Sequence, residues 1–372
     1  MIYLDNNATT RPDDQVIEIM NRYLREDYGN AGSISHRLGS MAKQAVELSR
    51  SIIADYFGVM TTDIIFTSGA TEANNIATLG LTHWLADQGR AVVTSTVEHK
   101  AVIEPIQQME TLGVDTLFLD PTPGSFARFT AEDVIERLPG NVGLVSLMSA
   151  NNETGCVSDI EGIAAAIKQA HPDCLVHSDF TQGLGKLEPP RLDNIDMLSA
   201  SGHKIYGPKG IGFLYINRHA RKRCKPLLFG GGQERGLSPG TQPVFLIAGL
   251  GKAVEMCGNE FRARQKNLDK ITGVMIEVMD SVGGVLNSSQ NRLPNTMNIY
   301  LPNRDAEAMM VRLKDDFAVS SGSACTSATF EPSHVLKAIF PEEPARWSQS
   351  LRFSWSHQTE NFESNSLSRL LR

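Results

Sequence analysis

The feature that most constrains the fold is an alternation of short apolar runs with amphipathic segments between residues 64 and 216. Helical spacing of apolar residues fills most of the intervals, for example at Ile160, Ile163 and Ile167. Such alternation predicts an α/β fold with a mainly parallel sheet that helices cover on both faces. Because ligands of such sheets bind beyond the carboxyl ends of the strands, the residues after each run are the first candidates for a site. The apolar runs lie at residues 64–67, 91–94, 116–119, 144–147, 174–177, 197–199 and 211–216.

Both flanks of this region have a different pattern. Residues 3–10 predict a brief strand and a loop, and residues 11–14 predict a helix start. A second amphipathic helix is expected to carry Met41, Ala45, Leu48 and Ile52. Past Gly230, the sequence predicts a long helical region over 244–280, strands at 297–301 and 351–354, and a helix over 306–313. A length of 372 residues suits two domains, which we place at residues 15–255 (large) and at 1–14 with 256–372 (smaller, α+β).

Charge and cysteine content exclude several classes of protein. Acidic and basic residues are well mixed, the net charge is -7, and no basic run favours nucleic acid as a partner. The first residues do not resemble a signal peptide and no apolar run reaches the length of a membrane span, so we expect a cytoplasmic protein without membrane contact. Five scattered cysteines without Cys-x-x-Cys spacing argue against a disulfide framework and a metal site, and leave open one reactive thiol.

The first strand end is rich in small residues. Thr67-Ser68-Gly69-Ala70-Thr71-Glu72 follows the run at 64–67 and is expected to open a helix. Backbone N–H groups at such a junction, helped by the helix dipole, can bind an anion. The alternative is a plain N-cap at Ser68 or Thr71.

Two further strand ends carry polar side chains. His99 follows the second run and is placed to stack on a flat ring or to move a proton, although a structural histidine is the alternative. Asn152 follows the fourth run and could bind a ring hydroxyl or a substrate carboxylate. Its alternative is a turn, which Asn-Asn favours by local hydrogen bonding.

The last two strand ends suggest a specific cofactor. Asp179 could pair with a protonated pyridine nitrogen or cap a helix, and Gln182 could reach a ring oxygen. Ser201 and His203 could bind phosphate oxygens, and the amine of Lys204 could bond covalently to an aldehyde such as pyridoxal 5′-phosphate (PLP). The alternative for Lys204 is a solvated lysine beside a Gly/Pro turn.

In this order along the chain, these motifs resemble the class V aminotransferase family of PLP enzymes and, within it, the cysteine desulfurases of the iron–sulfur and nitrogen-fixation type. The resemblance runs from Tyr3 to about Thr359. It implies PLP fold type I, with a mainly parallel seven-stranded sheet in the large domain and a smaller α+β domain. Its motifs are Tyr3–Thr10, Thr67–Glu72, Glu98-His99, Asn151–Gly155, Ser201–Lys204, Gly231–Gly236 and Ser320–Ser327.

The resemblance also implies a role for each site residue. Lys204 carries PLP, Asp179 pairs with the pyridine nitrogen, Gln182 contacts the ring oxygen, and His99 stacks on the ring and transfers protons. Asn152 contacts the cofactor and, together with Arg352, the substrate carboxylate, for which the arginine fork is suited. The phosphate is held by Ala70, Thr71, Ser201 and His203, with Thr241 supplied by the second subunit of a homodimer.

Cys325, in a loop at about 320–330, determines the reaction that the resemblance implies. A thiolate among small residues could attack the sulfur of L-cysteine, so that L-alanine and a persulfide on Cys325 result. A sulfur-acceptor protein would then receive the sulfur for iron–sulfur cluster assembly, tRNA thiolation or DNA phosphorothioation. The alternative is a buried, inert cysteine, which suits the other four cysteines better.

Several positions depart from the family pattern. Relatives usually carry a basic residue at Ser238, a small residue at Phe180 and a Leu-Gly-Arg continuation where Trp355 begins, and many have a longer C-terminus. These departures leave the sulfur acceptor open. They also leave two alternative functions: a selenocysteine lyase or other class V PLP enzyme, and a weakly active sulfur-relay subunit.

Overall fold

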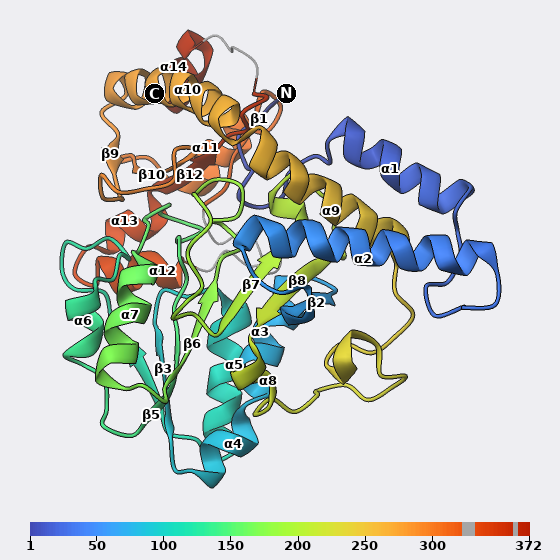
Figure 1. Cartoon of the computed structure of the whole chain (residues 1–372). Coiled ribbons are helices and arrows are strands. Elements are labelled where there is room, and N and C mark those ends of the chain that lie inside the picture. The colour runs from blue at the N-terminus through green and yellow to red at the C-terminus, as the bar shows by residue number, and fades with distance from the viewer. Residues whose placement is uncertain (322–331, 360–363) are drawn as a thin grey trace.

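The structure is a computed structural model that describes residues 1–321, 332–359 and 364–372 (Figure 1). The strands are β1 (Ile2–Tyr3), β2 (Ile64–Thr67), β3 (Ala91–Ser95), β4 (Thr116–Leu119), β5 (Val142–Ser146), β6 (Leu175–Asp179), β7 (Met197–Ser201), β8 (Gly212–Ile216), β9 (Val285–Leu286), β10 (Thr296–Tyr300), β11 (Phe317–Ala318) and β12 (Ser350–Ser354). The helices are α1 (Asp14–Arg25), α2 (Arg37–Phe57), α3 (Ala70–Leu79), α4 (Thr82–Asp87), α5 (Lys100–Thr111), α6 (Ala131–Ile135), α7 (Ile160–Ala170), α8 (Arg218–Arg221), α9 (Val244–Asn259), α10 (Phe261–Ser281), α11 (Ala306–Leu313), α12 (His334–Ile339), α13 (Pro344–Ser348) and α14 (Ser364–Leu371). Short 3-10 turns are η1 (Thr61–Asp63), η2 (Gly202–Lys204) and η3 (Gln233–Gly236).

A seven-stranded sheet in the order β2-β8-β7-β6-β5-β3-β4 forms the centre of the larger part of the molecule. All seven apolar runs are strands of this sheet, so the sequence prediction of the sheet is confirmed. The pairs from β7 to β4 are parallel, whereas β8 is antiparallel to both β7 and β2. Residues 202–211 between β7 and β8 are too few for a parallel crossover, which explains the reversed direction of β8.

Helices cover both faces of this sheet. Neighbouring residues of each strand point to opposite faces, and they pack in different core clusters. Phe66 and Val93 pack in one core cluster with α2, α7 and α9, whereas Ile65 and Val92 pack in another with α3 and α5. Both faces are therefore apolar, which is why the strands are continuous apolar runs in the sequence.

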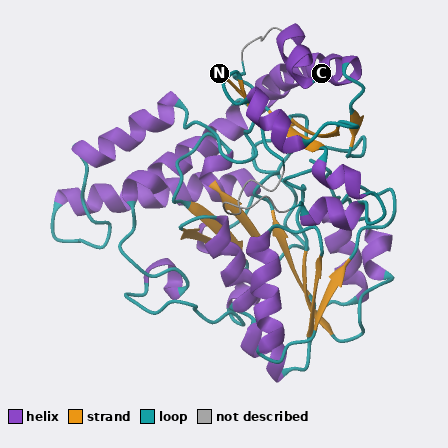
Figure 2. Cartoon of the chain, turned by 180° about the vertical axis from the view of Figure 1, so that it is seen from behind, coloured by secondary structure: helices purple, strands orange, loops and turns teal. Residues whose placement is uncertain are grey.

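A separate core cluster lies under the antiparallel sheet β12-β10-β9 and the helices α10, α11 and α14. Leu4 belongs to this cluster, and the backbone N–H of Asn6 donates to the carbonyl of Ser354, so the N-terminal segment packs with the C-terminal part. Figures 1 and 2 show both chain ends at this end of the molecule. The boundaries of the two domains stay a prediction.

Two details of the helices differ from the sequence prediction. The helical region over 244–280 consists of two helices, α9 and α10, which meet at Glu260. Leu48 of α2 was expected on the apolar face but is 63% exposed. The buried stripe of α2 contains small residues such as Ala45 and Ser49, and Gly251 of α9 approaches Ser49 so closely that a Cβ there would clash. Close contact between α2 and α9 thus selects the buried face.

None of the described helices combines the length and the apolar character that a membrane crossing requires.

Candidate active site

Asp179 lies at the carboxyl end of β6, where its side chain is almost completely buried. Its Oδ2 accepts a 2.8 Å hydrogen bond from Asn74 Nδ2 of α3, and its Oδ1 accepts a 2.9 Å bond from the backbone N–H of Thr181. Both donors are neutral. A buried carboxylate is unfavourable without a cationic partner, so this position suits a positively charged ligand group.

His99 follows β3 and is the N-cap residue of α5. It therefore has the structural role that the sequence analysis gives as the alternative. Its Nδ1 accepts a 3.1 Å bond from the backbone N–H of Ala101, which leaves the ring proton on Nε2 in the neutral form. Burial lowers the pKa of His99, and the charge of Lys204 lowers it further, against the opposite effect of Asp179. His99 therefore combines a capping role with a neutral imidazole whose pKa responds to the charges of these two groups.

The junction between β2 and α3 has the geometry of an anion site. Gly69 is the N-cap residue of α3, with φ 157° and ψ -178°, a conformation that is essentially restricted to glycine. Because Gly69 has no side chain to cap the helix, the first N–H groups of α3, including those of Ala70 and Thr71, can bind a phosphate. The alternative of a plain N-cap at Ser68 or Thr71 is wrong.

Ser201 and His203 lie next to this junction. Ser201 Oγ would be 3.7 Å from a Cβ placed on Gly69, so the hydroxyl borders the open helix end. His203 Nδ1 contacts Thr9 Oγ1 at 3.1 Å. Burial, together with the charge of Lys204, lowers the pKa of His203 to about 4, so its ring is neutral at neutral pH. Both side chains are thus neutral groups that can hydrogen-bond to an anion.

Lys204 lies in the η2 turn directly after β7 and is partly buried. Its Nζ donates to the carbonyl oxygens of Asn7 at 2.5 Å and Ala8 at 2.8 Å. The amine is thereby held at the site by the N-terminal segment, and the alternative of a solvated surface lysine is wrong.

Gln182 lies near Lys204 and shares a hydrogen-bond partner with it. Gln182 Nε2 donates to the same Asn7 carbonyl at 3.1 Å, and its Oε1 accepts from Lys186 Nζ at 2.6 Å. Both ends of the amide are therefore engaged within the protein. Its expected contact with a ring oxygen stays a prediction.

Arg352 is buried in β12 and reaches toward the loop after β5. Its Nη1 donates to the backbone carbonyl of Asn152 at 3.0 Å, and its Nη2 donates to Asp5 Oδ1 at 2.7 Å. The turn in this loop depends on the neighbour Asn151, whose Oδ1 accepts from the backbone N–H groups of Glu153 and Thr154. Asn152 contacts the guanidinium group of Arg352 through its backbone carbonyl. The expected contacts of its side chain with the cofactor and the substrate stay a prediction.

Thr241 is exposed on the segment between η3 and α9. Arg50 and Glu234 anchor this segment through a bidentate pair with two distances of 2.9 Å. Ser238, where relatives carry a basic residue, donates from Oγ to Glu72 Oε1 of α3 at 2.7 Å. Among the described residues no contact joins Thr241 to the phosphate junction of its own chain, so its role stays a prediction.

Cys325 lies outside the described residues.

The other departures from the family pattern lie in the hydrophobic core. Phe180 is buried and packs edge-to-face on Phe57, with ring centroids 6.1 Å apart. Trp355 is fully buried in the core cluster of the C-terminal part. His357 packs on the ring of Tyr206 at 4.6 Å. Phe180 and Trp355 therefore affect packing and leave the polar groups of the site in place.

The four described cysteines are free and buried. Burial raises the pKa of the thiols of Cys174 and Cys224 to about 12, and that of Cys257 to about 11. These three thiols stay protonated at neutral pH and are poor nucleophiles. The interpretation of these cysteines as inert is consistent with this result.

The residues that converge at this edge of the sheet fit PLP. The cofactor has an anionic phosphate, a pyridine nitrogen and an aldehyde, and the site presents an uncapped helix, a buried carboxylate and an amine. Two buried polar atoms next to Asp179, Asn74 Oδ1 and Thr181 Oγ1, have no hydrogen-bond partner among the described residues. Such atoms usually have a partner, which indicates that a polar ligand completes the site.

Four residues of the site were missed in the sequence analysis: Asn7, Asn74, Asp5 and Lys186. Asn7 is the most connected of them, since its carbonyl binds Lys204 and Gln182 and its Nδ2 binds Thr296 Oγ1 and the Asn152 carbonyl. Its motif, Tyr3–Thr10, was recognised, but no function was given to a single residue in it. Lys186 had no motif to draw attention to it.

Comparisons with known proteins agree with this geometry. The family model of the class-V aminotransferases matches residues 2–363. The cysteine desulfurase IscS of Serratia proteamaculans is 40% identical to this chain, over 97% of this chain and 89% of its own. A structure named NIFS-like protein has a TM-score of 0.90 and 31% identity, and covers 100% of this chain and 98% of its own. A structure of SspA in complex with cysteine has a TM-score of 0.84 and 33% identity, with 97% and 100% covered. The chain therefore belongs to the class-V aminotransferases and, within them, to the PLP-dependent cysteine desulfurases.

Proposed function

We propose that this enzyme takes the sulfur of L-cysteine onto Cys325, releases L-alanine and passes the sulfur to an acceptor protein. The observation that carries the proposal is the convergence of Asp179, His99 and Lys204 with Arg352 around one edge of the sheet. These groups lie on separate segments, and Asn7 and Asn152 link Lys204 to Arg352 through short contacts. The similarity to SspA, whose structure holds cysteine, supports L-cysteine as the substrate.

The residues that would hold PLP follow from the site. The N-terminus of α3 at Ala70 and Thr71 would hold the phosphate, together with the hydroxyl of Ser201 and the ring of His203. Asp179, which Asn74 keeps in place, would pair with the pyridine nitrogen. Lys204 would hold the cofactor covalently through its amine. When bound, PLP supplies an electron sink for bond changes at the α-carbon of the substrate.

Two residues of the site, His99 and Lys204, can act as bases. The neutral ring of His99 can accept or return a proton, because burial lowers the pKa of this residue. The amine of Lys204, when it is not bonded to PLP, would be the base that removes the α-proton of the substrate. Arg352 orients the substrate by binding its carboxylate, and it must then share its guanidinium group with Asp5.

Sulfur transfer needs a thiolate and no external oxidant. The Cys325 thiolate attacks the sulfur of the substrate, the new S–S bond forms, and the C–S bond breaks with its electron pair left on the substrate carbon. A proton on that carbon completes L-alanine, and Cys325 becomes a persulfide. An acceptor thiol can then attack the outer sulfur and regenerate Cys325.

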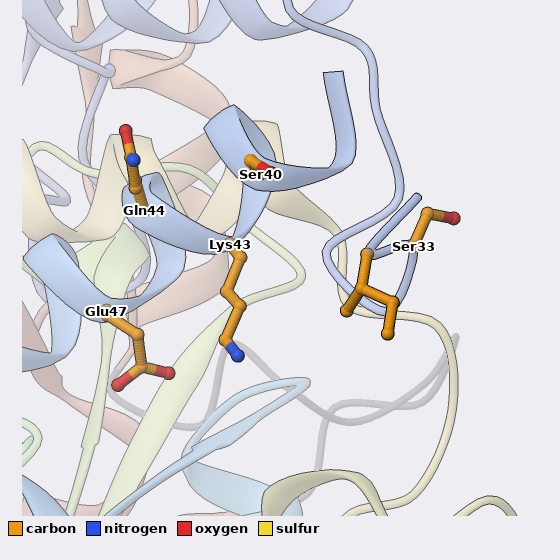
Figure 3. A pocket seen from close by; sticks show the side chains of 6 residues that line it. Ser33, Ser40, Lys43, Gln44 and Glu47 are labelled. Carbon is orange, nitrogen blue, oxygen red and sulfur yellow. The ribbon is translucent and has the colours of Figure 1, made fainter. Parts of the chain in front are cut away.

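The second copy of the chain in a homodimer would complete the phosphate site through Thr241. An exposed apolar surface supports a dimer: Ile34 is 85% exposed and Phe229 is 87% exposed. A groove of about 340 Å³ lies between α2 and the segment with Ser33 and Ile34. Figure 3 shows Lys43 and Glu47 extending from α2 beside this groove, opposite Ser33. A partner subunit over this groove would also cover Ile34, which lines it.

We place the enzyme in the cytoplasm, where free thiols such as those of the four described cysteines persist. The acceptor is a protein of iron–sulfur cluster assembly, tRNA thiolation or DNA phosphorothioation. The similarity to cysteine desulfurases named IscS supports the first of these pathways.

The test is the turnover of the purified holoenzyme with L-cysteine and a thiol reductant. We expect alanine and sulfide in equal amounts. Little turnover of L-cysteine together with rapid turnover of selenocysteine would show the selenocysteine lyase alternative to be right. Little turnover of either amino acid would favour the sulfur-relay alternative and contradict the proposal.

A further inference from the structure

Lys186 is a buried lysine next to the site that the proposed chemistry does not use. It lies four residues after Gln182 in the turn that follows β6, and only 8% of its surface is exposed. Its Nζ donates to Gln182 Oε1 at 2.6 Å and to Asn7 Oδ1 at 3.4 Å. Burial of a lysine amine is strongly unfavourable for its charged form. A lysine at a buried position therefore suggests a function that offsets this cost.

Asn7 links this lysine to Lys204. The Asn7 carbonyl accepts from Lys204 Nζ at 2.5 Å, while the Asn7 side-chain oxygen accepts from Lys186 Nζ. Two lysine amines therefore share one asparagine, one at its backbone and the other at its side chain. Among the described residues, the acceptors of Lys186 are amide oxygens and not a carboxylate.

Lys186 also determines how the amide of Gln182 is oriented. A lysine amine of this kind donates hydrogen bonds, so the atom of Gln182 that contacts it must be the oxygen. The nitrogen of the amide then points to the Asn7 carbonyl, at 3.1 Å. Without Lys186 the amide oxygen would lose its partner among the described contacts, and only the bond to the Asn7 carbonyl would fix the amide.

The charges around Lys186 are mostly positive. Burial, together with the charges of Lys204 and Arg352, lowers the pKa of Lys186 to about 7. The charge of Lys186 in turn lowers the pKa of His203. Cys257 has the opposite effect on the pKa of Lys186. Arg264 and His357 line the same small cavity as Lys186 and Lys204. Two amines this close together do not both hold a proton easily.

We propose that Lys186 is a positioning residue of the cofactor site, which fixes Gln182 and Asn7 and favours the unprotonated form of the Lys204 nitrogen. An unprotonated nitrogen is what Lys204 needs, both to bond to an aldehyde and to act as a base. Lys186 thus acts on the reaction through its neighbours. This inference rests on the proposed attachment of PLP to Lys204.

The test is a pH titration of the visible absorbance of the holoenzyme, which reports the proton on the nitrogen that joins Lys204 to PLP. Lys186→Met removes an amine that, with a pKa of about 7, is at least half charged at and below that pH, so a midpoint in this range is expected to rise by roughly half a pH unit or more. Lys186→Arg keeps a permanent charge and should hold the midpoint at or below the wild-type value. If the Met variant does not fold, Lys186→Gln serves as a second neutral variant, because its amide can keep a hydrogen bond to Gln182.

Lys168→Met is the matched control. Lys168 is also a partly buried lysine, but its Nζ binds Asp196 Oδ2 and the Cys174 carbonyl away from the site, both at 2.6 Å. This variant is expected to lose stability without a shift of the midpoint. A purely structural role of Lys186 would give the same pattern for Lys186→Met.

An unchanged or lowered midpoint in a folded neutral variant of Lys186 would overturn the inference. Failure of the proposed function gives a different result, since Lys204→Ala would then keep the pH-dependent absorbance of the wild type. If Lys204→Ala loses that absorbance and the Lys186 variants keep the wild-type midpoint, only the role of Lys186 is wrong.

Discussion

Arg352 and Asp5 form an ion pair of 2.7 Å that joins β12 to the N-terminal segment. Both side chains are largely buried, so the pair is little screened by solvent. The guanidinium group that is proposed to bind the substrate carboxylate is therefore already partly neutralised by a carboxylate of the protein. Asp5 holds Arg352 in position and, at the same time, competes with the substrate.

We predict that Asp5→Asn lowers the KM for L-cysteine several-fold, because the asparagine can still accept a hydrogen bond but no longer opposes the substrate carboxylate. The variant should also lose stability, since a buried charge loses its partner. Steady-state kinetics and thermal unfolding measure the two effects. Asp14→Asn is the control, because Asp14 pairs with Arg11 at the same distance on the exposed surface. An unchanged or higher KM in a folded Asp5→Asn enzyme would contradict the proposed role of Arg352.

The second prediction concerns the carboxylate at the end of β6. Asp179→Asn keeps the hydrogen bond from Thr181 possible but removes the negative charge that is proposed to pair with the pyridine nitrogen. We expect kcat to fall by roughly a hundredfold or more, the order of magnitude for loss of one preorganised electrostatic contact. Weaker PLP retention in dialysis should accompany the loss of activity.

Asp196→Asn is the matched control for this variant. Asp196 is also buried, but it pairs with Lys168 at 2.6 Å and accepts from the backbone N–H of Val176, at the opposite end of the strands. This change should reduce stability and leave PLP retention intact. Equal PLP loss in both variants would show that Asp179 acts only through the fold.

The third prediction is a pH dependence of stability caused by Glu98. Burial raises the pKa of Glu98 from 4.5 to about 8, against the hydrogen bonds that its Oε1 accepts from Met148 N and Ser95 Oγ. The folded protein keeps a proton that the unfolded chain loses. The stabilising contribution of Glu98 is therefore complete below pH 4.5 and is lost as the pH rises toward 8, by at most about 1.4 kcal/mol per pH unit.

Glu98→Gln removes this titration and keeps a neutral side chain of the same shape. The free energy of unfolding of the variant, measured in urea, should increase relative to that of the wild type as the pH rises from 4.5 to 8. Glu110→Gln on the exposed surface of α5 should show no such trend. A constant difference between Glu98→Gln and wild type over this range would mean that Glu98 is ionised in the folded protein.

Much of the fold could be predicted because local patterns determine it. Apart from the edge strand β4, the strands from β2 to β8 are buried on both faces, and this makes them visible as continuous apolar runs. The direction of β8 could not be predicted from such a run, since it depends on the length of the connection after β7. The exposure of Leu48 could not be predicted either, because the close contact of α2 with α9 depends on Gly251, which is far away in the sequence.

The site was predictable where a residue follows a strand, as for Asp179, His99 and Lys204. Asn7, Asp5 and Lys186 act through contacts with distant segments, and their neighbours in the sequence do not reveal those contacts. Asn7, for example, meets Lys204 across 197 positions and Thr296 across 289. Only the folded chain shows that one asparagine connects the N-terminal segment to both lysines.

The central claim is that Cys325 receives the sulfur of L-cysteine. The most direct measurement is a single turnover of the holoenzyme with L-cysteine in the absence of reductant, followed by mass spectrometry of its peptides and an assay of alanine. We predict one additional sulfur atom on the peptide with Cys325, matched by one alanine per active site, and neither product for Cys325→Ala. Unmodified Cys325 in a wild-type enzyme that still forms alanine, or normal sulfide release by Cys325→Ala, would contradict the account.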